Sequence, residues 1–103
     1  MPNKNYIRGR AFEYELKKMY EGMGCACFRT AGSHSVADLI VLHPVSGIKV
    51  IQAKLCKSET DAKRMITRFK KKPFLPQSKH YAQFFMVKVP RVGLFMGEVP
   101  TIK

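Results

Sequence analysis

The chain has 103 residues, 46% of them hydrophobic, which suffices for one small folded domain and excludes a disordered chain. Its 19 Lys and Arg residues face only 7 Asp and Glu residues, so the formal net charge is +12. A domain this basic indicates a polyanionic partner, most often nucleic acid, although a solubilising surface or a basic binding protein without catalysis would have the same charge.

The first predicted element is a helix. We expect residues 1–8 to form a flexible basic arm at the start of a single domain that spans the whole chain. From residue 9 to residue 23 the apolar side chains recur at helical spacing, and Gly22 and Gly24 supply the stop. The expected buried arc of this helix consists of Phe12, Leu16, Met19, Tyr20 and Met23.

Strands and a second helix follow. We predict strands at residues 25–30, 38–42, 48–55, 82–89 and 93–99, with a loop of small residues at 31–35. Ser58 to Asp61 resembles a capping box, and the apolar residues after it recur at helical spacing until Pro73 ends the helix. The order α-β-β-β-α-β-β predicts a mixed α/β domain with a central sheet flanked by helices.

The cysteines and the apolar runs limit the class of protein further. Cys25, Cys27 and Cys56 contain no C-x-x-C pair, and the three histidines lack ligand spacing, so we expect free thiols rather than a zinc site. The N-terminus has no apolar signal core, and no apolar run approaches about 18 residues. We therefore expect no membrane partner and a protein of the cell interior.

A few polar residues stand out as candidates for metal-dependent hydrolysis, which needs carboxylates on rigid elements. Asp38 opens an otherwise aliphatic strand, where a carboxylate is costly to bury unless it is paired or binds metal, although an exposed Asp in a turn would give the same pattern. Gln52 and Lys54 share one face of their strand, which fits either a catalytic face or a half-exposed one. Glu13 and Glu15 border the buried arc of the first helix, where each either reaches a site or is solvated.

Three segments carry a resemblance to a known family: RGRAFEYEL at 8–16, FRTAGSHSVADLIVL at 28–42 and VIQAKLCK at 50–57. They resemble the archaeal-type Holliday-junction resolvases of the PD-(D/E)XK nuclease superfamily. The family pattern is a Gly followed by E-x-E-L, an R-[ST]-A-G-S loop, an Asp that opens a strand, and E-x-K on the next strand. The matching residues here are Gly9, Glu13, Glu15, Leu16, Arg29, Thr30, Ala31, Gly32, Ser33, Asp38 and Lys54.

The resemblance implies a restriction-endonuclease-like fold and Mg²⁺-dependent paired nicks in four-way DNA junctions, in a prokaryotic or viral host cell. It implies that Glu13 and Asp38 bind metal, that Lys54 is the catalytic lysine, that Arg29 contacts DNA phosphate and that Ser33 lies beside it. Mn²⁺ should substitute for Mg²⁺. Further candidates for phosphate contact are Arg8, Arg10 and the basic residues of the second helix from Lys63 to Lys72, Arg64 among them.

Gln52 departs from the family pattern, because it stands where the family has a carboxylate. We expect its amide oxygen to ligate the metal as part of the catalytic site, with one negative charge less; the alternative is a fold that has lost its chemistry. Besides the junction nuclease, a non-catalytic nucleic-acid-binding module of the same fold and a nuclease for other branched or duplex DNA therefore stay open.

We also expect a homodimer. A junction with two-fold symmetry calls for two cleavage sites at a fixed separation, which a two-fold dimer supplies. The apolar residues of the last two strands are either its interface or part of the core: Phe84, Phe85, Phe95 and Met96.

Overall fold

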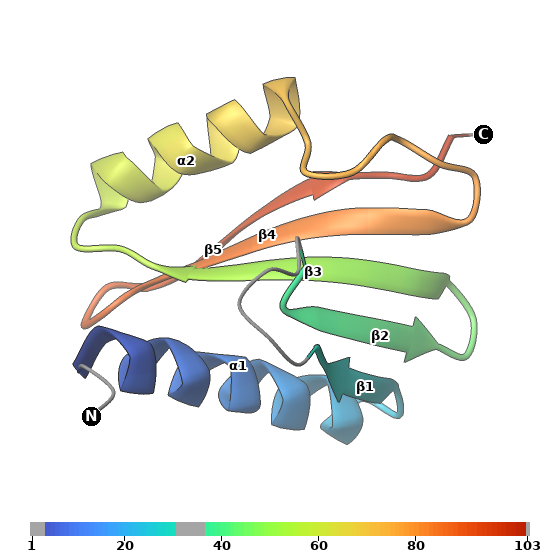
Figure 1. Ribbon diagram of the computed structural model, residues 1–103, viewed down its shortest axis with the longest axis horizontal. Coiled ribbons are helices and arrows are strands. Elements are labelled where there is room, and N and C mark those ends of the chain that lie inside the picture. Colours follow the sequence, from blue (N-terminus) through green and yellow to red (C-terminus); the bar gives the residue numbers. More distant parts are fainter. Residues whose placement is uncertain (1–3, 31–36, 103) are drawn as a thin grey trace.

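Five strands and two helices make up the part of the chain that the structure, a computed structural model, describes, namely residues 4–30 and 37–102 (Figure 1). In chain order they are α1 (Lys4–Gly22), β1 (Ala26–Arg29), β2 (Leu39–His43), β3 (Gly47–Leu55), α2 (Glu59–Lys71), β4 (Tyr81–Val89) and β5 (Gly93–Val99). The element order is the predicted one, and the strands form one mixed sheet flanked by the helices, which confirms the predicted fold class.

The first helix is longer than its sequence pattern indicates. It begins at Lys4 rather than Gly9, so residues 4–8 are helical and the expected arm is wrong for them. One glycine inside a helix costs only about 1 kcal/mol relative to alanine, which is why Gly9 does not prevent the helix from extending to Lys4. Residues 1–3 of the expected arm, and the expected loop at 31–35 with Ser33, lie outside the described residues.

The strand order along the sheet follows the order along the chain, from β1 to β5. Neighbouring strands run antiparallel except β3 and β4, which are parallel and are joined through α2. A parallel pair needs such a crossover because both strands begin at the same end of the sheet. α1 packs on β1, β2 and β3, whereas α2 packs on β4 and β5 (Figure 1).

Successive residues of β4 show that the two helices lie on opposite faces of the sheet. Phe84 and Met86 belong to the core under α1, whereas Phe85 and Val87 belong to the core under α2. Side chains alternate between faces in the same way along β3, where Gln52 lies on the α2 side and lines a pocket with side chains of that helix.

The buried face of α1 is narrower than predicted. Phe12, Leu16 and Tyr20 are buried against the sheet, as expected. Met19 and Met23, however, are 39% and 56% exposed. Met23 lies beyond the last residue of the helix, and Met19 lines an open pocket beside Lys88 and Leu94 rather than the closed core.

Most apolar residues of the last two strands are core residues and not free surface. Phe84 and Phe85 are buried, and Phe95 packs against the core under α2. Of the four candidates for a dimer interface, Met96 is exposed, whereas Phe84 and Phe85 are buried inside a single chain and leave little surface for a partner.

The start of α2 follows the predicted capping pattern. Ser58 is the N-cap, and its Oγ accepts a hydrogen bond from the backbone N–H of Asp61 at 3.2 Å. Acidic residues occupy the first turn of this helix and basic residues its last turn, as the helix dipole favours.

No helix in the described residues is long and apolar enough to cross a membrane.

Candidate active site

β3 has an open edge where β2 begins. The pairing of these strands starts at Leu39 and Ile51, so within the described residues the last four residues of β3 face no β2 residue. Their other side pairs with β4. An unpaired strand edge presents backbone donors and acceptors, so side chains or ligands can bind there.

The four residues predicted to form the catalytic site all line one cavity at this open edge. The cavity has a volume of about 620 Å³. Glu13 reaches it from α1, and Gln52 and Lys54 reach it from β3. Asp38, the residue immediately before β2, completes the set. Arg8 also lines it, as do Gly9, Ala53, Leu55, Cys56, Lys57 and Pro90. Segments far apart in sequence thus meet at one place.

Asp38 is held firmly by the backbone around it. Its Oδ2 accepts a hydrogen bond from the backbone N–H of Ala53 at 2.8 Å, and its own N–H donates to the carbonyl of Ile51 at 2.8 Å. Its carbonyl accepts from the N–H of Thr30 at 3.0 Å. The hydrogen bond to Ala53 compensates in part for burying the carboxylate, and Oδ1 makes no hydrogen bond within the described part of the chain.

Glu13 is paired with Arg29. Arg29 Nε donates to Glu13 Oε1 at 2.9 Å, and both side chains are mostly buried. The hydrogen bond to Glu13 raises the pKa of Arg29 above its ordinary value. The acid of α1 and the arginine of β1, which the resemblance assigns to metal and to phosphate, therefore bind each other in this structure.

Tyr14 joins this pair and was not among the predicted site residues. The guanidinium of Arg29 lies 4.9 Å from the centre of its ring, and that of Arg10 lies 5.6 Å from it. A hydrogen bond from Arg10, together with the charges of Arg10 and Arg29, lowers the pKa of Tyr14 below its ordinary value. The spacing of Arg10 and Tyr14, four residues apart on one helix, was the available sequence signal.

Gln52 and Lys54 are the polar residues of β3 in the cavity. Both lie on the α2 side of the strand, as alternation predicts. Lys54 is exposed and Gln52 is half-buried, and neither side chain makes a hydrogen bond or ion pair to a described residue. Both are thus available to a ligand.

The donor set of this cavity suits a hard divalent cation, which prefers oxygen ligands. Asp38 and Glu13 offer carboxylates, and Gln52 offers an amide oxygen. In the residues described, however, no group of three or more His, Cys, Asp or Glu side chains is placed to hold a metal. The arrangement therefore fits a cation held by few charges, with one of the two carboxylates already paired with Arg29.

The basic residues predicted to contact DNA differ in their position relative to the cavity. Arg8 lines the cavity. Lys63 and Arg64 lie on the exposed side of α2, next to Glu59 at 3.4 Å and Asp61 at 3.6 Å. Exposed pairs of this kind are weak and stabilise little.

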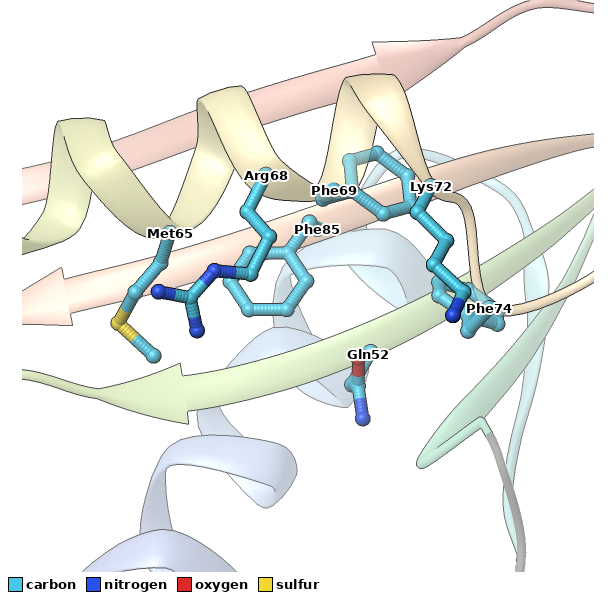
Figure 2. A pocket seen from close by; sticks show the side chains of 7 residues that line it. All are labelled: Gln52, Met65, Arg68, Phe69, Lys72, Phe74 and Phe85. Atoms are coloured by element: carbon cyan, nitrogen blue, oxygen red, sulfur yellow. The ribbon is translucent and has the colours of Figure 1, made fainter.

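Two other cations lie at the C-terminal end of α2. Arg68 and Lys72 extend from the helix toward β3 and line a second pocket that also contains Gln52 (Figure 2). Sequence reasoning included them only as members of a basic helix. Their spacing of four residues, which puts them on one helix face, was the signal that distinguishes them.

Comparisons with known proteins support the fold. A scan against protein-family models finds no match, and neither does a search of curated proteins. Among solved structures, the chain is similar to Hjc of Archaeoglobus fulgidus, a Holliday junction resolvase from an archaeal hyperthermophile. The TM-score is 0.57 and the identity 19%, over 87% of this chain and 71% of that chain. This likeness confirms the resolvase-like fold that the sequence motifs indicate.

Proposed function

We propose that this protein is a divalent-metal-dependent endonuclease of the cell interior that cuts four-way DNA junctions. The observation that carries the proposal is the convergence of Glu13, Asp38, Gln52 and Lys54 on one cavity, in a fold similar to that of a junction resolvase. The family resemblance assigns Glu13, Asp38 and Lys54 to the catalytic site, and Gln52 stands where the family has a carboxylate. The net charge of +12 fits the polyanionic substrate.

The residues of the cavity have distinct roles in this proposal. Asp38 and the amide oxygen of Gln52 would hold Mg²⁺, with Glu13 as a further ligand. When bound, the cation supplies Lewis acidity toward the phosphate and activates a water molecule. The Lys54 ammonium orients the attacking water and offsets the negative charge that develops on the phosphate.

Arg29 couples substrate binding to the site. Its guanidinium is bound to Glu13 without DNA, and a phosphate is a second anion that competes for the same donors. Transfer of Arg29 to the phosphate frees the Glu13 carboxylate for the metal. Arg8, on the wall of the cavity, is a further candidate for a phosphate contact.

A homodimer belongs to this proposal, because paired nicks on opposing strands require two sites of fixed separation. Light scattering at micromolar concentration, with and without junction DNA, measures the mass. We expect twice the chain mass of 11.8 kDa for the free protein. A monomer under both conditions would contradict the dimer.

A non-catalytic DNA-binding module of the same fold is the second candidate. One observation favours it: in the part of the chain that the structure describes, no three acidic or other metal-ligating side chains gather, and Gln52 stands where the family has a carboxylate. In that case Asp38 would serve only its hydrogen bond to Ala53.

A cleavage assay separates these functions. A labelled four-way junction and a linear duplex of the same sequence are incubated with and without Mg²⁺. We expect paired nicks in the junction only, and only with the metal. Equal cleavage of the duplex would indicate a nuclease of broader substrate range, and binding without cleavage in Mg²⁺ or Mn²⁺ would indicate the binding module.

A further inference from the structure

A second pocket lies between α2 and β3, next to the candidate active site (Figure 2). Its volume is about 220 Å³. The side chains that line it are Gln52, Met65, Arg68, Phe69, Lys72, Phe74 and Phe85. Gln52 also lines the candidate active-site cavity, so the two spaces meet at this side chain.

Aromatic rings form the apolar wall of the pocket. Phe69 stacks on Phe74 with ring centres 5.5 Å apart, and it contacts Phe85 at 5.4 Å. Phe69 and Phe85 are buried, whereas Phe74 and Met65 are half-buried and leave apolar surface open to a ligand. Every nucleobase has a π face that stacks on such a surface, independent of its sequence.

Two cations stand over this aromatic wall. Arg68 lies in the last turn of α2 and Lys72 is its C-cap residue, and their charged ends reach toward β3 (Figure 2). Within the described residues neither has a carboxylate within ion-pair distance, whereas Lys63 and Arg64 of the same helix do. Cations that the protein leaves unneutralised are those that attract phosphates.

Aromatic surface next to free cations suits the two parts of one nucleotide. The base stacks on the aromatic surface, and the phosphates bind the cations. Bases inside a duplex are stacked and do not reach a pocket of side chains. At the centre of a four-way junction the strands exchange between helices. A base there loses less stacking free energy when it leaves the stack than a base inside a continuous duplex does.

We propose that this pocket is a nucleotide subsite that receives one base from the junction centre, next to the scissile phosphate. Phe74 and Met65 contact the base, while Arg68 and Lys72 hold its phosphates. The position beside the scissile phosphate rests on the proposed function, because the shared Gln52 links the pocket to the cleavage site.

The first experiment uses mononucleotides and needs no cleavage. Thymidine 5′-monophosphate, deoxyribose 5-phosphate and inorganic phosphate are titrated separately into the protein and followed by NMR. We expect the Met65 methyl and Phe74 ring signals to shift with the mononucleotide, which should bind about tenfold more tightly than either phosphate without a base. Unshifted Met65 and Phe74 signals would overturn the subsite, as would equal affinity for all three probes. The pocket would then suit a phosphate alone or a partner of another class, such as an acidic peptide.

The second experiment uses junctions with 2-aminopurine at single positions around the centre, without divalent cations so that the DNA stays intact. We expect fluorescence to rise at one position when wild-type protein binds, because the base leaves the stack. Arg68→Gln with Lys72→Gln should abolish the rise and weaken mononucleotide binding about tenfold.

A control of equal charge change is Lys18→Gln with Lys79→Gln, two exposed residues away from the pocket. We expect it to keep both the fluorescence rise and the mononucleotide affinity. Equal losses in both double variants would overturn the subsite, because the effect would then follow net charge. If mononucleotide binding is as expected but junctions are never cut, the subsite stands and the proposed nuclease function fails.

Discussion

At the scale of single residues, Asp38 has a structural role besides the proposed catalytic one. Its Oδ2 binds the N–H of Ala53 at 2.8 Å, at the open edge of β3. Asparagine keeps an oxygen for this hydrogen bond but removes the charge that a cation needs. The two roles are therefore separable by the choice of substitution.

We expect Asp38→Asn to lower junction cleavage about a hundredfold or more, because metal catalysis contributes several kcal/mol. Junction binding should stay within a few-fold of wild type, since the arginine and lysine contacts remain. Asp38→Ala should also lower the free energy of unfolding by about 1 kcal/mol, because Ala53 loses its acceptor. Cleavage rates, gel-shift affinities and urea unfolding measure these effects. Wild-type cleavage by Asp38→Asn would show that the metal site is elsewhere.

Substitutions of Gln52 test whether its neutral side chain serves as a metal ligand. We expect Gln52→Glu to lower the Mg²⁺ concentration for half-maximal junction cleavage, since it adds a negative charge at nearly unchanged length. Gln52→Ala removes the oxygen and should raise that concentration, and Mn²⁺ should support the parent at lower concentration than Mg²⁺ does. Metal titrations of the three proteins decide the matter. An alanine variant that matches the parent would exclude Gln52 as a ligand.

Tyr14 should ionise before the buried Tyr20. The hydrogen bond from Arg10 and the charges of Arg10 and Arg29 lower the pKa of Tyr14 from 10.0, whereas burial raises that of Tyr20. The pKa of Tyr14 is lower in the folded chain than in the unfolded one. Ionised Tyr14 therefore stabilises the folded chain at high pH, and this stabilisation is lost as the pH falls through the pKa of the folded chain.

Phenolate absorbance followed against pH tests this order. We expect Tyr14→Phe to remove a step that precedes the ionisation of Tyr20, and Arg10→Gln to move that step to higher pH. An unchanged early step in Tyr14→Phe would refute the assignment.

At the scale of the elements, the contact of α2 with β5 depends on a missing side chain. A Cβ added to Gly97 would lie 2.6 Å from Ile66 Cγ2 and 3.4 Å from Phe69 Cδ2. Ile66 is β-branched and has few alternative rotamers, so the helix must shift rather than the methyl group. Gly97 therefore allows α2 to pack closely on the sheet, and this packing places Arg68 and Lys72 beside β3.

We expect Gly97→Ala to lower the free energy of unfolding by about 1–3 kcal/mol, the usual cost of overpacking. Adding Ile66→Ala removes the clashing methyl group, so the double variant should lose less stability than the sum of the two single variants. Urea unfolding of all four proteins measures the coupling. Additive losses would show that the two residues do not clash.

At the scale of the whole molecule, the charge of +12 governs affinity for DNA. Contact with six or more phosphates should reduce junction affinity about 10³-fold between roughly 50 and 200 mM salt, because bound counterions are released. Gel shifts or fluorescence anisotropy over this range measure the slope. An affinity independent of salt would contradict binding through phosphates.

Much of the architecture follows from sequence because its signals are local. The strand at 93–99 has the predicted bounds, and the N-cap is the predicted Ser58. Side-chain alternation places Gln52 and Lys54 on one face without any knowledge of the fold. The start of α1 was missed, since a single glycine weakens a helix without ending it.

The sequence by itself determined which residues are candidates: the acids, the Gln-x-Lys frame and the excess of positive charge. Only the tertiary structure decided their partners. Arg29 pairs with Glu13, and Arg68 and Lys72 lie beside Gln52, because α1 and α2 pack on opposite faces and β3 extends past the first residue of β2. The physical reason is that periodicity reports which way a side chain points from its own element. What lies opposite depends on contacts between segments far apart in the chain.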